Sequence, residues 1–343
     1  MKIIITGGSG YLGSWLCRTF VSRGEEVVNF DLLPSPSPHS LIRDIQGDIR
    51  DASSLSRAFA GADVVIHSAA RVPLTKALRE FETINVGGTR TVLEVAQKLR
   101  VPKVIHISSS AVFGIPAENP VRVDTPRKPV DPYGVSKARA EMECEKFRER
   151  GLNVVIIRPR TIVGPERLGI FHILFDWIRR DMPVFVIGSG NNKLQFVSVR
   201  DLCQACVLGI QGANFATVGI GGRSFGTLRE DLTALIAHAK SRSGIVSLPA
   251  SPTIWTLAIL DKLNLSPFAA WHYLTYHIDF FYDDTATRVM GYCPQDGNVE
   301  ILCNAYDSSL QENQSGAGVV RGNLSPHRRA PRQGLLTLLK WRP

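Results

Sequence analysis

Tyr133 and Lys137 are the residues whose types and spacing point most directly to chemistry, in the stretch DPYGVSKARAEME at 131–143. On a helix, this spacing places both side chains on one face. A phenol has a pKa of about 10, and a neighbouring ammonium favours the phenolate, so Tyr133 can exchange a proton with a substrate hydroxyl near neutral pH. Three serines at 108–110 precede this stretch, and one of their hydroxyls can hold the same substrate oxygen. The set predicts proton transfer at an alcohol oxygen.

A second chemical signal is the glycine pattern G-x-x-G-x-x-G formed by Gly7, Gly10 and Gly13. It directly follows the apolar run KIIIT and directly precedes an amphipathic segment, so it predicts a strand–turn–helix unit that cradles a dinucleotide pyrophosphate. Asp31 ends the next apolar run, 18 residues beyond Gly13, where a carboxylate accepts ribose hydroxyls and repels a 2′-phosphate. NAD is therefore favoured over NADP, and Asp48 is expected near the adenine. A tyrosine acid/base beside NAD predicts interconversion of a secondary alcohol and a ketone by hydride transfer.

The elements that must position these residues alternate over the first 210 positions. The runs KIIIT, EVVNFD, DVVIHSA, KVIHISS and NVVIIRP are nearly continuous in apolar residues, which is typical of strands covered on both faces. Amphipathic segments of helical length lie between them. This order predicts an α/β fold with a doubly wound parallel sheet, the Rossmann arrangement, and ligands at the carboxyl ends of its strands.

The pattern changes after about residue 164, where loops and short strands separate the helices. We therefore expect an NAD-binding Rossmann core at 1–163 and a smaller substrate-binding lobe at 164–310, interleaved with the last sheet elements at the C-terminal end of the sheet. A basic, flexible tail at 311–343 follows. The apolar, aromatic segment at 245–280 predicts packing within the lobe or, alternatively, an apolar substrate wall or a membrane-leaning surface.

The net charge of +9 over 343 residues is concentrated in the tail. Six basic residues and no acidic residue follow position 313, and subtracting these six leaves about +3 for the rest of the chain. A basic tail can contact nucleic acid, anionic lipid or an acidic partner, or it can stay solvated. We expect a flexible tail with at most weak peripheral membrane contact, and no nucleic-acid partner.

The six cysteines are scattered along the chain. Cys203 and Cys206 lie in an apolar helical segment without a second pair or a histidine cluster, so they predict core positions rather than a metal site. Nothing suggests a disulfide framework, which favours a reducing compartment. No leader precedes the first strand, and no apolar run reaches the roughly 18 residues of a membrane span. A cytoplasmic protein without a bound metal is expected.

Jointly, these motifs resemble the extended short-chain dehydrogenases/reductases, the NAD-dependent epimerase/dehydratase family. The resemblance covers about residues 1–300 and also includes HSAA at 67–70, NVGGT at 85–89 and RPRTIVGP at 158–165. It implies a small-molecule substrate and a homodimer.

The resemblance also implies the role of individual residues. Tyr133 is the acid/base, Lys137 binds the nicotinamide ribose and tunes the tyrosine, and Ser109 holds the substrate oxygen. The implied cofactor contacts are Gly7, Gly10, Tyr11, Leu12, Gly13, Asp31, Asp48, Ile49, Ser68, Ala69, Ala70, Tyr133, Lys137, Arg158 and Pro159. The implied substrate contacts are Ser110, Ala111 and Thr161.

Departures from the family pattern bear on the substrate. Ser110 and Ala111 stand where sugar-nucleotide dehydratases carry an acidic pair, which disfavours elimination chemistry. Thr161, Val163 and Leu194 replace residues that grip the diphosphate in sugar-nucleotide enzymes, and a leucine cannot substitute for an arginine there. The pattern favours the 3β-hydroxysteroid and sterol dehydrogenase branch, with a largely apolar, sterol- or isoprenoid-like substrate.

Two alternatives stay open. The first is a nucleotide-sugar epimerase or reductase with altered phosphate contacts, in which Arg160 or Lys193 serves by another geometry. The second is a non-catalytic, NAD-sensing scaffold. The intact trio of Ser109, Tyr133 and Lys137 counts against the scaffold, because a binding module does not need it.

Overall fold

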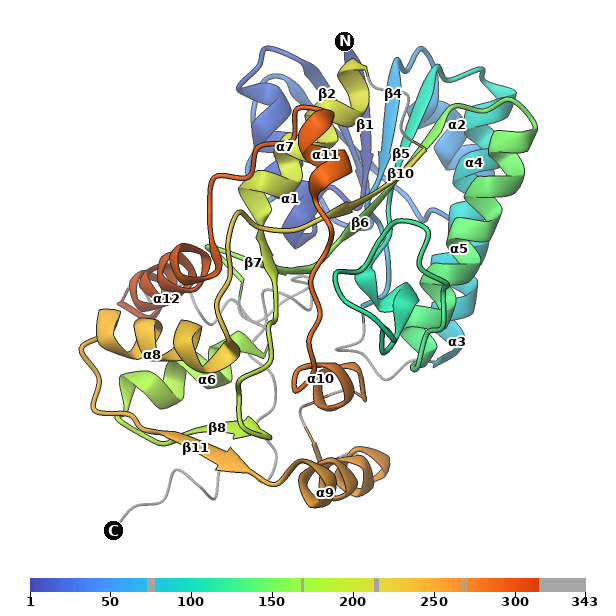
Figure 1. The fold of residues 1–343 in the computed structure, drawn as a ribbon. Coiled ribbons are helices and arrows are strands. Elements are labelled where there is room, and N and C mark those ends of the chain that lie inside the picture. The colour runs from blue at the N-terminus through green and yellow to red at the C-terminus, as the bar shows by residue number, and fades with distance from the viewer. Residues whose placement is uncertain are drawn as a thin grey trace.

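A computed structural model describes residues 1–72, 78–167, 170–212, 216–263, 265–266, 268 and 270–314. Its centre is a seven-stranded sheet in which all neighbouring strands run parallel (Figure 1). Across the sheet the strands follow in the order β10 (Thr217–Ile220), β6 (Val154–Pro159), β5 (Lys103–Ile107), β4 (Val64–His67), β1 (Lys2–Thr6), β2 (Glu26–Asp31) and β3 (Ile42–Gln46). This order confirms the predicted doubly wound parallel sheet.

Helices cover both faces of this sheet, which explains the continuous apolar runs. Successive strand residues point to opposite faces, so Ile3 and Ile5 pack on one side and Ile4 on the other. The first side is covered by α1 (Tyr11–Val21) and α7 (Val199–Gln211). The second is covered by α2 (Ala52–Phe59), α4 (Thr89–Lys98) and α5 (Pro132–Glu149). Shorter helical segments join the strands on this side, namely α3 (Leu78–Glu80), the π-helix η1 (Phe81–Gly88) and the 3₁₀ segment η2 (Ser110–Phe113).

A smaller lobe lies below the sheet in Figure 1 and has its own apolar core. Its strands form two short parallel pairs, β7 (Thr161–Val163) with β9 (Phe196–Ser198) and β8 (Val184–Ile187) with β11 (Ile245–Leu248). Its helices are α6 (Phe171–Arg179), α8 (Leu228–His238), α9 (Ala250–Lys262), α10 (Ala270–Thr275) and α12 (Asn298–Gln314). By contrast, α7, β10 and α11 (Thr285–Val289) return to the sheet, so sheet and lobe alternate along the chain.

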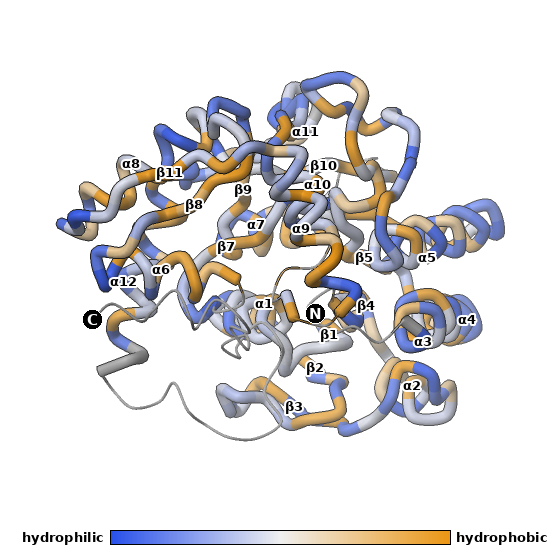
Figure 2. Tube along the Cα trace, turned by 90° about the horizontal axis from the view of Figure 1, so that it is seen from below, coloured by the Kyte–Doolittle hydropathy of each residue, from blue (hydrophilic) through white to orange (hydrophobic). Residues whose placement is uncertain are grey.

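The apolar segment at 245–280 divides into two parts. Trp271 and Tyr273 of α10 are buried, as packing within the lobe requires. On α9 no residue is buried, and Trp255 is 69% exposed. Figure 2 looks at the molecule from below and shows this apolar helix at the end of the lobe. Helix α9 therefore packs on α10 and β8 of the lobe as predicted, but it buries none of its residues and keeps its outer side open.

Cys203 and Cys206 are buried on α7 against the sheet, which confirms the prediction of core cysteines. Within the part of the chain that the structure describes, no group of His, Cys, Asp and Glu side chains is placed to hold a metal ion. No helix among the same residues combines the length and the apolar character that crossing a bilayer demands. Helix α12 continues to Gln314, so the predicted tail begins as helix, and the rest of the tail lies outside the described residues.

Candidate active site

The glycine turn between β1 and α1 allows a ligand to approach the backbone closely. Gly7 has a φ of +74°, and a Cβ on it would lie 2.7 Å from the backbone of Ala69. A Cβ on Gly13 would lie 2.0 Å from the carbonyl oxygen of Gly7, so neither position accepts a side chain. Gly10 precedes α1 and no side chain caps this helix, so the amides of its first turn are available to an anion. These features fit the pyrophosphate of a dinucleotide.

Other predicted cofactor contacts border the same turn. The segment at 68–70 directly follows β4, and the Oγ of Ser68 donates to the carbonyl oxygen of Thr6 at 2.8 Å. Tyr11 and Leu12 are the first residues of α1. The structure thus gathers these positions at the carboxyl ends of β1 and β4, where a doubly wound sheet binds its ligands.

The two predicted adenosine acids have different surroundings. Asp31 ends β2, and its carboxylate accepts the backbone N–H groups of Ser9 at 3.1 Å and Leu33 at 3.2 Å. Burial raises the pKa of Asp31. Asp48 is bound by the Arg50 side chain, whose guanidinium holds the pKa of Asp48 below its usual value. Asp31 is therefore placed at the glycine turn, whereas the Asp48 carboxylate already has a cationic partner. The next residue along, the predicted contact Ile49, is buried.

Asp31→Ala should weaken the binding of NAD more than that of NADP. The variant loses the acceptor for the ribose hydroxyls, and it also loses the charge that repels a 2′-phosphate. We expect the Kd for NAD to rise about tenfold. Fluorescence titration with both nucleotides measures the change. Asp63→Ala is the control, because Asp63 accepts the Lys2 amide at the opposite end of the sheet. An equal loss for both nucleotides would contradict the assignment of Asp31.

Tyr133 lies in the first turn of α5, at the carboxyl end of β5. The Asp131 side chain caps this helix by accepting the Gly134 N–H at 2.9 Å, and Pro132 occupies its first position. Burial raises the pKa of Tyr133 to about 12, and a hydrogen bond with Ser109 acts in the opposite direction. The phenol is therefore protonated at neutral pH and bonded to the serine that the sequence singled out.

Lys137 lies one turn further along α5. Its Nζ donates to the carbonyl oxygen of Ile107 at 2.7 Å, and burial lowers its pKa to about 8. The favouring of the phenolate by this ammonium stays a prediction, since Lys137 is not among the groups that shift the pKa of Tyr133 in the protein without cofactor. The cation that lowers the pKa of Tyr133 is instead Arg167.

The three serines of the run at 108–110 have three different partners. Ser108 Oγ donates to Glu141 at 2.6 Å. Ser110 Oγ accepts from Nη1 of Arg160 at 2.9 Å. Of the three, Ser109 is the one bonded to the phenol of α5, and its Oγ also accepts the backbone N–H that follows in η2. Ser108 and Ser110 are therefore bonded to other side chains of the protein, and Ser109 remains the candidate that holds the substrate oxygen.

Arg158 has a structural partner where a cofactor contact was predicted. Its Nε and Nη2 donate to the two carboxylate oxygens of Glu141 at 2.9 and 2.8 Å, and its Nη1 donates to the carbonyl oxygen of Val123. Both side chains of this ion pair are buried. Pro159 follows at the end of β6. Contact of this position with NAD stays a prediction, and the guanidinium itself is engaged within the protein.

The predicted substrate contact Thr161 leads to Tyr276 and Arg167, which the sequence did not indicate, and to Arg160, which it did. Its Oγ1 lies 3.5 Å from the hydroxyl of Tyr276, and the charges of Arg160 and Arg167 both act on this tyrosine. The other two predicted substrate contacts, Ser110 and Ala111, are buried in η2. No spacing rule identifies these neighbours, because they come from separate parts of the lobe. The order of the motif RPRTIVGP was the single available signal.

His67 and His106 form a buried pair beside this site, with ring centroids 5.3 Å apart. The ring nitrogens of His67 lie 2.7 Å from the Thr6 hydroxyl and 2.9 Å from that of Thr89. Both ring nitrogens of His106 are buried, and neither has a hydrogen-bond partner among the described residues. Burial, with the charge of Lys137, lowers the pKa of His67 to about 3 and that of His106 well below its usual value. Both rings are therefore neutral at neutral pH.

His106→Leu should raise the free energy of unfolding at pH 7 by about 1–3 kcal/mol, because it removes two buried polar atoms without partners. A histidine whose pKa is depressed by folding contributes stability above its unfolded pKa of about 6.5 and loses it as the pH falls. The gain should therefore be larger at pH 5 than at pH 7. Urea unfolding at both pH values measures it, with His238→Leu as the control at an exposed histidine. A gain that does not change with pH would contradict this explanation.

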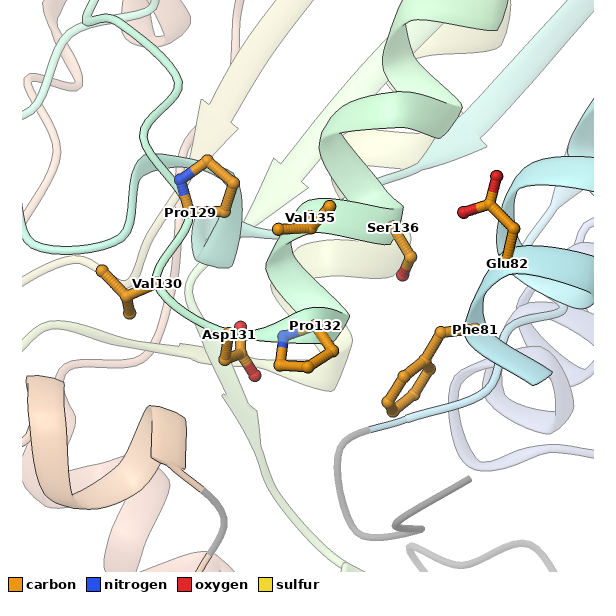
Figure 3. A pocket seen from close by; sticks show the side chains of 8 residues that line it. All are labelled: Phe81, Glu82, Pro129, Val130, Asp131, Pro132, Val135 and Ser136. Carbon is orange, nitrogen blue, oxygen red and sulfur yellow. The ribbon is translucent and has the colours of Figure 1, made fainter. Parts of the chain in front are cut away.

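A surface hollow of about 470 Å³ opens on the outer side of the first turn of α5 (Figure 3). Side chains from η1, from the segment at 129–131 and from α5 line it. Phe81 belongs to this lining, and its ring also packs edge-on against Tyr133 at a centroid distance of 6.1 Å. The three residues predicted to be catalytic, Ser109, Tyr133 and Lys137, are absent from the lining, so the hollow lies beside the predicted reacting centre rather than around it.

With this geometry described, comparison with known proteins gives the family. The sequence profile of the NAD dependent epimerase/dehydratase family matches residues 3–221. The chain belongs to this family. Membership confirms the resemblance inferred from the motifs, and it confirms the predictions of an enzyme, of oxidoreductase chemistry and of NAD as the cofactor.

The relatives whose names give a substrate do not share one substrate class. The Sinorhizobium fredii protein y4nG is 38% identical over 340 residues, which cover 98% of this chain and 85% of that protein. The 4-hydroxy-2-methyl-3-oxo-4-farnesyl-3,4-dihydroquinoline-1-oxide ketoreductase of Stigmatella aurantiaca is 27% identical over 347 residues, covering 96% of this chain and 100% of that enzyme. The crystal structure of UDP-glucose 4-epimerase from Thermotoga maritima with UDP-glucose has a TM-score of 0.76 at 23% identity, covering 91% of this chain and 100% of that chain. Family membership alone therefore leaves the substrate open.

Proposed function

We propose that the protein interconverts a secondary alcohol and a ketone by hydride transfer with NAD. The observation that carries this proposal is the hydrogen-bonded pair of Tyr133 and Ser109 at the carboxyl end of β5, near the glycine turn. A phenol and a hydroxyl that meet in this way can both contact one substrate oxygen. One group then moves the proton while the other holds the oxygen as its charge changes.

Each residue of the trio has a separate task in this proposal. Tyr133 gives its proton to the carbonyl oxygen during reduction and takes it back during oxidation. Its high pKa keeps the proton in place until a substrate accepts it. Ser109 holds the same oxygen, and Lys137 binds the nicotinamide ribose from its place beside Ile107. NAD, when bound, would accept the hydride during alcohol oxidation, and NADH would supply it during ketone reduction.

The substrate that we propose is largely apolar, of the sterol or isoprenoid type. The positions that hold a diphosphate in sugar-nucleotide enzymes carry no charge here. Leu194 is fully buried and pairs through its backbone with Phe280, so it lies in the lobe core. Val163 is also fully buried. The farnesyl group in the name of the Stigmatella aurantiaca relative supports the same substrate class.

The alternative is a nucleotide-sugar epimerase or reductase with altered phosphate contacts. The specific observation in its favour is the positive charge of Arg160 and Arg167 close to Tyr276 and Tyr133. Lys193, the other candidate for a phosphate contact, is exposed, and its backbone N–H donates to Asp279.

Incubation of the purified protein with NAD and a panel of sterols, isoprenoid alcohols and UDP- or dTDP-sugars tests the proposal. Net formation of NADH with an apolar alcohol supports it. Inversion of a sugar carbon without net NADH would exclude the leading choice and identify an epimerase. A reductase acting on nucleotide sugars would instead oxidise NADH in a parallel incubation with NADH and a nucleotide keto-sugar.

The organisation of the whole chain also belongs to this proposal. We divide it into a core at 1–163, a lobe at 164–310 and a tail at 311–343, and we expect a homodimer. Sedimentation velocity tests the dimer. Deletion of residues 321–343, followed by liposome sedimentation at low and high salt, tests a weak contact of the basic tail with membranes. Unchanged sedimentation would leave the tail without a membrane role.

A further inference from the structure

Arg160 is a buried cation that no carboxylate of the described residues neutralises. It is 2% exposed, and the groups that it contacts among the described residues are neutral. Its Nε donates to the carbonyl oxygen of Gln195 at 3.2 Å, and its Nη1 donates to the Ser110 hydroxyl. The guanidinium also stacks on the ring of Phe280 at 3.7 Å. These contacts fix the side chain in place and leave its charge without a counter-charge.

Arg167 is a second cation of this kind. It is half-buried, and its Nε is buried without a hydrogen-bond partner in the described parts of the chain. Its guanidinium lies 5.3 Å from the ring centre of Tyr11. The groups that favour its charge are the phenols of Tyr11, Tyr276 and Tyr133, with no Asp or Glu among them. The Nε–H group of Arg167 therefore has no acceptor among the described residues, and it belongs to a guanidinium whose charge acts on Tyr133, the proposed acid/base.

Arg158 shows what the same chain does with a structural arginine. It lies in β6, two residues before Arg160, and donates to both oxygens of the buried Glu141 carboxylate. Removing a guanidinium from water is costly unless an anion accompanies it. Among the described residues, the chain supplies that anion for Arg158 and not for Arg160 or Arg167, and a bound ligand is one source of the negative charge that these two lack there.

We infer that Arg167, supported by the fixed charge of Arg160, binds an anionic group of the substrate, a carboxylate or a phosphate, close to the carbon that reacts at Tyr133. Burial raises the pKa of Tyr276 and the charges of both arginines lower it, so both guanidinium groups lie near this one hydroxyl. Arg160 holds Ser110, the neighbour of Ser109. The planar fork of arginine matches both kinds of anion. The inference rests on the proposed function for the reacting centre and adds an acidic group to its apolar substrate.

The test uses the full-length protein saturated with NAD, so that the pyrophosphate site is already filled. Hexanoate, hexan-1-ol and inorganic phosphate are titrated separately, and the rise of Tm with concentration gives an apparent Kd. Hexanoate and hexanol share one chain and differ in charge, while phosphate distinguishes the second source of anion. We expect at least one anion to bind more tightly than hexanol. Arg167→Gln should raise the Kd of that anion by about 10- to 100-fold.

Arg200→Gln is the matched control, because Arg200 is exposed at the start of α7 and should leave the anion affinity unchanged. Arg167→Lys keeps the charge and should retain part of the affinity. Equal binding of hexanol and both anions, or equal binding by the wild type and Arg167→Gln, would overturn the inference. The comparison of hexanoate with hexanol on the wild type decides the question even if a variant fails to fold.

The same assay separates this inference from the proposed function. Tyr133→Phe should bind the anion as the wild type does, because the guanidinium is intact. Anion binding that depends on Arg167, in a protein that forms no NADH with any alcohol, would remove the proposed function and leave the subsite. Formation of NADH with an alcohol, together with equal anion binding by the wild type and Arg167→Gln, would do the reverse: it would keep the proposed function and remove the subsite.

Discussion

Tyr133→Phe should lower the turnover number for both alcohol oxidation and ketone reduction by about 10²- to 10⁴-fold. The change removes only the phenolic oxygen, which is the group that moves the proton. The ring keeps its edge-on contact with Phe81, and Asp131 still caps α5. The structure around the glycine turn is untouched, so the affinity for NAD should stay as it is in the wild type.

The pH dependence follows from the same phenol. Reduction needs the protonated phenol, whereas oxidation needs the phenolate. Burial raises the pKa of Tyr133 to about 12 in the protein without cofactor. Oxidation should therefore speed up as the pH rises from 6 to 9, while reduction stays nearly constant over this interval. Initial rates in both directions measure the two profiles, and the variant should lose the slope for oxidation.

The control for this prediction is a tyrosine that is buried outside the site. Tyr306 lies in α12 and packs edge-on against Phe175 in the lobe core. Tyr306→Phe should retain turnover. If Tyr133→Phe instead keeps wild-type turnover in both directions, another group moves the proton, and the role given to Tyr133 is wrong.

Local sequence patterns were sufficient to predict the sheet and the cofactor turn. Apolar runs such as Ile3–Ile5 predict strands covered on both faces, and the core places these residues on both sides of the sheet. The steric requirement at Gly7 and Gly13 is also local, because it arises within one strand–turn–helix unit. The four-residue spacing of the tyrosine and lysine motif similarly follows from one helix.

The environment of the reacting centre could not be predicted in the same way. Tyr276 and Thr161 are 115 residues apart, and they meet because the lobe folds back onto the end of the sheet. Burial also raises the pKa of Tyr133 and lowers that of Lys137, and burial depends on the packing of distant elements. The exposed side of α9 is another such case, because an apolar composition does not say which neighbours a helix will have.

Glu141 connects the elements that hold the candidate site. Its carboxylate is fully buried and accepts the Ser108 hydroxyl at 2.6 Å, the Arg127 guanidinium at 3.1 Å and two N–H groups of Arg158. The residue lies on α5, one turn beyond Lys137, and its partners come from β6, from the end of β5 and from the loop before α5. One side chain thereby connects the helix that carries Tyr133 to the carboxyl ends of β5 and β6.

Glu141→Ala should lower the free energy of unfolding by about 3–5 kcal/mol, because it leaves the buried guanidinium of Arg158 without a counter-charge. Urea unfolding measures the loss. Glu145→Ala is the control on the next turn of α5. Glu145 pairs only with the partly exposed Arg127 in the described structure, so its loss should cost less than about 1 kcal/mol. Adding Arg158→Met to Glu141→Ala should restore much of the stability, because the uncompensated charge is then gone. Similar losses for Glu141→Ala and Glu145→Ala would show that the buried ion pair does not anchor α5.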